Sequence, residues 1–198
     1  MSRKPERTEA VASSMRALRP LMETEVSVAS LEATKAVLLQ LCTRTDLFNF
    51  EEFPLPDKGV GCIYLIQEDP DGRCSLYVNC GLPGQVSRPH NHGGSWAIVG
   101  GVIGVEHHRL YERMDEGSTS GHAELKLKGE LDVCPGTAVS MLADGIHSIH
   151  ALSDQPLLHL HLYGWGFPKQ GEREEYDLET GEIQRFRLEN MGFIEDAR

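Results

Sequence analysis

Apolar residues recur at helical spacing in the first fifty positions of the chain. Two sets share one helix face each: Val11, Met15 and Leu18 in the first, and Leu31, Thr34, Leu38 and Leu41 in the second. Pro20 should stop the first helix, and Ser30 stands just before the second set. The pattern therefore predicts two short amphipathic helices.

From Gly61 onward the pattern changes to short runs rich in Val, Ile, Leu and Tyr. Turn sequences such as Asp71-Gly72 and Asp144-Gly145 separate the runs about every eight to twelve residues. This rhythm is typical of an all-β sandwich or barrel. Strands are expected at 61–67, 73–80, 87–92, 96–103, 105–113, 122–128, 137–142, 147–152, 157–165 and 183–188.

The change of pattern falls in a segment, 50–59, that contains two prolines and a glycine. We place the boundary there, with an N-terminal helical segment at 1–57 and a barrel domain at 58–198. A chain of 198 residues has room for one such domain but not for two catalytic domains.

Charge narrows the range of partners. The chain has 19 Lys and Arg against 30 Asp and Glu, a formal net charge of −11, and its basic residues are scattered. Such a surface repels phosphate backbones, so no nucleic acid partner is expected.

The longest apolar run, 96–105, is far short of the roughly 20 residues that a membrane helix needs. No membrane partner is therefore expected. The first charged residues are not followed by the apolar segment of a secretory signal, so a cytoplasmic location is expected.

The five cysteines are odd in number and include no CxxC pair. This composition argues against a disulfide framework and against a zinc-thiolate site. The thiols are expected to be reduced and mostly structural.

Histidine is the residue type that suggests chemistry, with nine in the chain. In an extended segment, alternate residues face the same way, so His90-x-His92 presents two imidazoles at a spacing suited to one metal ion. An HxH pair alone is weak evidence. Its surroundings, with Gly84 before it and Ala97 and Gly104 after it, resemble the first motif of the cupins. The resemblance implies a double-stranded β-helix barrel, also called a cupin or jelly-roll barrel.

Most cupins have a glutamate ligand where this chain has Ala97, so a third imidazole must come from elsewhere. His147 stands where the second cupin motif supplies its histidine. His150 is the alternative, although three residues later it would face the other side of the strand. The resemblance implies a metal site formed by His90, His92 and His147, with further coordination positions open.

The segment after the third ligand is similar to that of the thiol dioxygenases, namely cysteine dioxygenase and the bacterial 3-mercaptopropionate dioxygenases. The similarity covers His161-Leu162-Tyr163-Gly164, Phe167, Tyr176-Asp177 and Thr180-Gly181. It implies that His161 orients Tyr163, whose hydroxyl acts toward the substrate thiolate as donor or proton relay. His159 stands where the family has a serine.

The chain departs from that family at substrate positions. Ile63 stands near the place of the substrate-binding arginine or glutamine, so cysteine is not the favoured substrate, and Ala97 replaces the cysteine that crosslinks to tyrosine in the animal enzymes. Arg173 matches an arginine near the pocket of bacterial relatives and is the candidate anchor for a substrate carboxylate. It could instead be a solvated charge within its acidic run. Trp96 could wall the substrate pocket or belong to the core.

Three other histidines are expected to be structural. His107 and His108 are neighbours and must face opposite ways, so at most one points into the barrel. His122 is expected at the surface.

A metal held by three neutral imidazoles keeps its full charge and favours anionic ligands such as a thiolate. Imidazoles also suit zinc and copper, so iron(II) as cofactor follows from the resemblance. The expected function is a mononuclear iron dioxygenase that uses O2 to oxidise the thiol of a small thiol carboxylate to a sulfinate. Alternatives are a three-histidine cupin that acts on a non-thiol small acid, by C–C cleavage or lyase chemistry, and a non-catalytic binding module.

Overall fold

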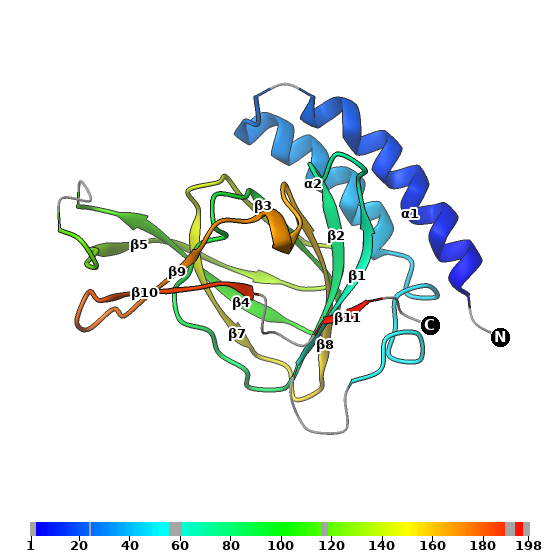
Figure 1. Cartoon of the computed structure of the whole chain (residues 1–198). Helices are drawn as coiled ribbons and strands as arrows, with labels where there is room; N and C mark the ends of the chain where they lie inside the picture. Colours follow the sequence, from blue (N-terminus) through cyan, green and yellow to red (C-terminus); the bar gives the residue numbers. More distant parts are fainter. Residues whose placement is uncertain (1–2, 24, 56–60, 116–118, 189–192, 196–198) are drawn as a thin grey trace.

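The computed structural model describes residues 3–23, 25–55, 61–115, 119–188 and 193–195. Within them, two helices are followed by a barrel of β-strands (Figure 1). The predicted mostly-β architecture with a short N-terminal helical segment is confirmed. The boundary expected between residues 57 and 58 lies outside the described residues.

The helical segment consists of α1 (Lys4–Leu18), a short 3-10 helix η1 (Arg19–Met22) and α2 (Val28–Cys42). As the position of Pro20 predicted, α1 does not continue past it. The helix ends at Leu18, and the residues around Pro20 form η1. Helix α2 begins slightly earlier than Ser30. Ser27 and Ser30 form a reciprocal capping box, in which each side chain accepts a hydrogen bond from the backbone of the other.

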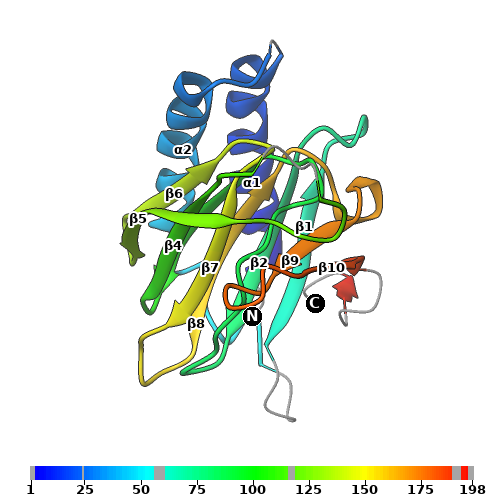
Figure 2. The ribbon, with the colours of Figure 1, turned by 90° about the vertical axis from the view of Figure 1, so that its left-hand side faces the viewer.

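The strands form a six-stranded sheet of order β11-β1-β2-β8-β3-β6, a three-stranded sheet of order β5-β4-β7 and a separate β9-β10 hairpin. Their bounds are β1 (Cys62–Glu68), β2 (Ser75–Gly81), β3 (Ala97–Ile103), β4 (Glu106–Arg113), β5 (Leu125–Val133), β6 (Ala138–Met141), β7 (Ile146–Ala151), β8 (Leu157–Tyr163), β9 (Arg173–Tyr176), β10 (Ile183–Phe186) and β11 (Phe193–Glu195). A second 3-10 helix, η2, spans Phe167–Lys169. The two sheets form a double-stranded β-helix (Figure 2).

The strand predicted at 87–92 is absent as a regular element. That segment meets β7 through isolated bridges, Val86 with His150 and His90 with His147, and through hydrogen bonds between Ser87 and Ile149. The strand expected at 122–128 begins three residues later and continues to Val133. The pattern did not predict β9 or β11.

Strand β8 shows how the six-stranded sheet separates two cores. Leu158, Leu160 and Leu162 belong to a cluster formed with α1 and α2, which cover the outer face of this sheet (Figure 1). Their neighbours His159, His161 and Tyr163 point to the other face by strand alternation. Tyr163 belongs to the cluster inside the barrel. The barrel therefore has an apolar outer layer and an interior that includes buried polar side chains.

In the described part of the chain, each helix is too short or too polar to span a lipid bilayer. All five cysteines are free thiols, and four of them are buried.

Candidate metal centre

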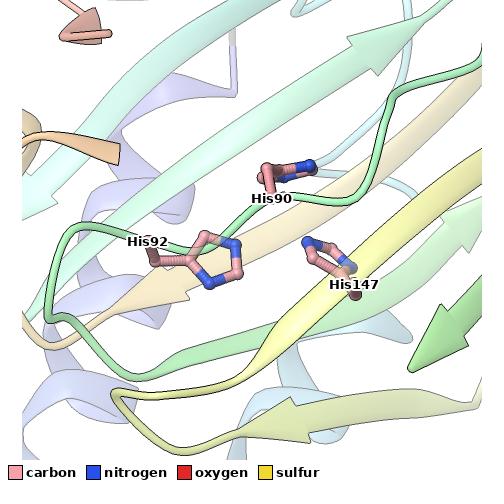
Figure 3. A group of neighbouring side chains, drawn as sticks. All are labelled: His90, His92 and His147. Atoms are coloured by element: carbon pink, nitrogen blue, oxygen red, sulfur yellow. The ribbon is translucent and has the colours of Figure 1, made fainter. Parts of the chain in front are cut away.

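Three histidines meet at one point of the barrel wall. His90 and His92 come from the extended segment before β3, and His147 comes from β7 (Figure 3). Each offers a ring nitrogen, and the three nitrogens lie within 4.8 Å of one another. His92 and His147 are buried and His90 is half-buried. This is the group expected from the two cupin-like motifs.

Backbone pairing brings the rings together. The His90 amide donates to the His147 carbonyl at 2.8 Å, and the His147 amide donates to the His90 carbonyl at 3.0 Å. Two residues that exchange both hydrogen bonds in this way lie directly opposite each other, with their side chains on one face. Long-range backbone pairing thus fixes the contact between the two ligand-bearing segments.

Strand β9 holds the same segment from its other side. The Asn91 amide donates to the Glu174 carbonyl at 3.0 Å, and the Tyr176 amide donates to the Pro89 carbonyl at 2.8 Å. The side-chain oxygen of Asn91 also accepts from the amides of Gly93 and Glu174. Asn91, the residue between the two histidines, therefore anchors the loop while its neighbours face inward.

Hydrogen bonds leave metal-binding nitrogens free. His90 Nδ1 lies 2.9 Å from the Arg88 carbonyl, which can only accept, so Nδ1 carries the proton and Nε2 keeps its lone pair. His147 Nδ1 is bonded to His108, and its Nε2 is buried with no hydrogen-bond partner among the described residues. His92 Nδ1 is likewise buried and unpartnered. Buried polar atoms without partners are rare, and a metal ion would satisfy the free nitrogens of this group.

Burial keeps the three rings uncharged. It lowers the pKa of His90 to about 4, although the Arg88 carbonyl opposes the effect. It lowers the pKa of His92 and of His147 well below the ordinary range, and nearby positive groups act in the same direction. Neutral imidazoles are the form that binds metal, so at neutral pH the ligands require no proton loss.

Strand β4 contributes two residues that sequence reasoning did not assign to the site. Glu106 is 2% exposed and His108 is fully buried. Burial alone would raise the pKa of Glu106, but contacts with His108 and His159 outweigh burial and lower it, so the carboxylate is ionised.

His107 and His108 do face opposite ways: His107 pairs with Asp132 outside, and His108 bonds to His147 inside. The sequence did contain a signal for Glu106 and His108, because these two residues and Leu110 alternate along a strand and so share one face.

Tyr163 lies beside the cluster, with its ring centroid 5.5 Å from that of His92. Its hydroxyl is 3.0 Å from His161 Nδ1, the pairing that the resemblance implied. Burial raises the pKa of Tyr163, with Arg173 partly opposing, and burial lowers the pKa of His161 to about 3. His159 contacts Glu106 instead, at 3.6 Å, so it lies next to a different partner from the Tyr163 pair.

Arg173 is buried at the start of β9, so its interpretation as a solvated charge is wrong. Its guanidinium carbon lies 5.4 Å from the centre of the Tyr163 ring. Nε and Nη2 both donate to the Gln170 side-chain oxygen, at 3.0 and 2.7 Å. The structure therefore places this cation next to Tyr163.

Other expected positions lie elsewhere. Trp96 belongs to the cluster on the helix side of the sheet, so the structure does not bring it together with the histidines. The next residue, Ala97, faces the barrel interior and pairs with Tyr163 across the sheet. Ile63 packs on that interior cluster as an apolar side chain. His150 and His122 are exposed, which removes His150 as a third ligand to this group.

Comparison with known proteins gives distant structural likenesses and no family. No protein-family model matches the chain, and no curated protein sequence matches it. A conserved protein of Klebsiella pneumoniae with a double-stranded β-helix domain is 16% identical over 65% of this chain and 90% of its own, with a TM-score of 0.44. KdgF from Halomonas sp. is 18% identical over 60% of this chain and 93% of its own, with a TM-score of 0.43.

An oxalate oxidase solved with the substrate analogue glycolate is 13% identical. The match covers 55% of this chain and 52% of the oxidase, with a TM-score of 0.42. At these identities and scores the likenesses carry no conclusion about activity. Function has to be inferred from the side chains of the centre itself.

Proposed function

We propose that the protein is a mononuclear iron(II) dioxygenase that oxidises the thiol of a small thiol carboxylate to a sulfinate. One observation carries the proposal: the three-histidine group and the His161–Tyr163 pair adjoin each other, with Tyr163 next to His92. The group includes no carboxylate, and Ala97 occupies the position from which cupins usually supply one. The reaction balances as R–SH plus O2 giving R–SO2⁻ plus H⁺, with no external reductant.

His90, His92 and His147 would hold the ion through ring nitrogens that the fold keeps neutral and free of other partners. When bound, iron(II) would favour the thiolate form of the substrate and bring it together with dioxygen. Three uncharged ligands suit this role, because they leave the positive charge of the ion to the anionic substrate.

Tyr163 would donate a hydrogen bond to the reacting sulfur or oxygen. Burial keeps its phenol protonated, so a proton is present at neutral pH. His161 is close enough to fix the hydroxyl at 3.0 Å and is itself uncharged. With Nδ1–H of His161 donating to the phenol oxygen, the hydroxyl proton is free to point toward substrate.

Arg173 would hold the substrate carboxylate. A buried guanidinium beside the ring of Tyr163 is an unusual charge in an otherwise enclosed site. Gln170 satisfies two of its donors and orients the group. Arginine presents a planar set of donors that matches a carboxylate.

Ile63 favours a second candidate function. Its apolar side chain faces the barrel interior near the place where the thiol dioxygenases carry their substrate-binding polar residue. A three-histidine metal enzyme that acts on a non-thiol small acid, by C–C cleavage or lyase chemistry, would need no polar group there. Substrate screening separates the two functions.

The deciding experiment is reconstitution of the protein with iron(II) under nitrogen, followed by measurement of oxygen uptake with cysteine, 3-mercaptopropionate and mercaptosuccinate. Thiol-dependent uptake with one O2 consumed per sulfinate formed is the expected result. Iron-loaded protein that consumes no oxygen with any thiol would sink the proposal and favour the second candidate.

A further inference from the structure

A chain of hydrogen bonds runs from His147 through His108 to the buried carboxylate of Glu106. His147 Nδ1 lies 3.0 Å from His108 Nδ1, and His108 Nε2 lies 2.9 Å from Glu106 Oε2. Glu106 and His108 occupy alternate positions of β4, so both side chains point inward. Strand β7, which carries His147, is paired directly with β4.

Only one arrangement of protons lets neutral rings form this chain with an ionised carboxylate. A carboxylate only accepts, so His108 Nε2 carries the proton that it donates to Glu106. When the His108 ring carries that one proton alone, its Nδ1 is bare and accepts from His147 Nδ1. His147 is left with a bare Nε2, the buried nitrogen that has no partner among the described residues.

We propose that Glu106 and His108 are positioning residues that hold His147 in the tautomer and orientation needed for Nε2 to bind a metal. The inference rests on the metal centre of the proposed function, and not on its thiol substrate. A hydrogen bond to the far nitrogen of a ligand histidine fixes its ring and strengthens its donor atom.

The burial of Glu106 supports this assignment. A carboxylate that is 2% exposed is strongly destabilising unless hydrogen bonds or opposite charges compensate it. Its described contacts are His108 at 2.9 Å and His159 at 3.6 Å, and both are histidines inside the barrel. Leucine would fill such a site at lower cost, so the carboxylate has a task that an apolar residue could not perform.

Two variants test the chain through metal affinity. His108→Phe removes the acceptor of His147 Nδ1–H, and Glu106→Gln keeps the side-chain volume but removes the charge that fixes the His108 proton. We expect each to weaken Co²⁺ binding about 10- to 100-fold, measured by competition with a chromophoric chelator. The milder Glu106→Gln change keeps the test valid where His108→Phe fails to fold.

A spectroscopic readout separates positioning from general damage. Long-range ¹H–¹⁵N correlation of the metal-free protein with ¹⁵N-labelled histidine reports which ring nitrogen carries the proton. Wild type should show His147 protonated at Nδ1 and His108 at Nε2. The Glu106→Gln variant should lose the defined His108 pattern while its circular dichroism stays native.

His107→Phe is the matched control, because His107 lies next to His108 on β4 but pairs with Asp132 outside the barrel. It should leave Co²⁺ affinity unchanged. Wild-type affinity in both Glu106→Gln and His108→Phe would overturn the inference, and so would an Nε2-protonated His147 in the metal-free wild type. A wild-type protein that binds no divalent metal overturns the metal centre itself, and the inference with it.

Discussion

Single side chains of this centre owe their chemistry to burial. Tyr163 is 4% exposed, and burial raises the pKa of its phenol, so the hydroxyl keeps its proton at neutral pH. His161, 9% exposed, has a lowered pKa and is an uncharged partner. A neutral hydrogen-bonded pair beside the three histidines is suited to orienting a proton toward an anionic substrate.

Replacing Tyr163 by Phe should therefore slow thiol-dependent oxygen uptake by about 100-fold or more, because the donor is lost. Co²⁺ affinity should stay unchanged, since the ring still packs beside His92. Tyr111→Phe is the control, because the Tyr111 hydroxyl bonds Ser148, away from the three-histidine group. Equal uptake by Tyr163→Phe and wild type would contradict the catalytic role of Tyr163.

Prediction from sequence reached the residues that a known motif marks. His90, His92 and His147 were expected together from the resemblance to the two cupin motifs, and the structure brings their ring nitrogens within 4.8 Å of one another. Glu106 was missed and His108 was expected to be structural, since a charged strand residue is expected in solvent unless something pairs with it. That pairing partner, His147, is distant in sequence and appears only in the fold.

At the scale of elements, the histidine segment is held between β7 and β9. Strand β9 was not predicted, because a sequence of Arg, two Glu and Tyr lacks the apolar character of a strand. It forms because its backbone pairs with β10 and with Pro89 and Asn91. Strand existence here depends on long-range pairing, which local propensity does not encode.

The loop after His92 gives an element-scale prediction. Gly93 and Gly94 both have positive φ, 58° and 80°, but a Cβ on Gly93 would lie 2.4 Å from the Gly171 carbonyl oxygen, whereas one on Gly94 meets nothing within 4 Å. Gly93→Ala should therefore displace the loop and weaken Co²⁺ binding about tenfold or more. Chelator competition measures the effect.

Gly94→Ala serves as the control for backbone strain alone, and it should lower stability modestly with affinity retained. If both alanine variants weakened metal binding equally, the contact between the loop and Gly171 would have no special part in forming the site.

For the molecule as a whole, the polar interior makes folding sensitive to acid. Burial lowers the pKa of His161 from 6.5 to about 3, so between these values the unfolded chain binds a proton that the native state does not. Stability is then fully present above about pH 6.5 and is lost as pH falls, by up to about 1.4 kcal/mol per pH unit for this group.

The free energy of unfolding of the metal-free protein, measured in urea at pH 7, 6 and 5, should fall with pH. In His161→Gln the fall in unfolding free energy per pH unit should be smaller, by the equivalent of up to about one proton. His122→Gln is the control, because His122 is exposed and should leave the slope as in wild type. Identical slopes in His161→Gln and wild type would show that His161 titrates normally in the folded protein.

The position of Trp96 between the six-stranded sheet and the helices has a practical consequence for solution studies. The chain has two tryptophans, and they sample different surroundings: Trp96 is 7% exposed in the apolar layer under the helices, and Trp165 is 40% exposed. Emission from Trp96 should be blue-shifted and should move to longer wavelength when the helices detach from the sheet. Intrinsic fluorescence is thus a reporter of the outer layer, and it can separate loss of packing there from changes at the histidines.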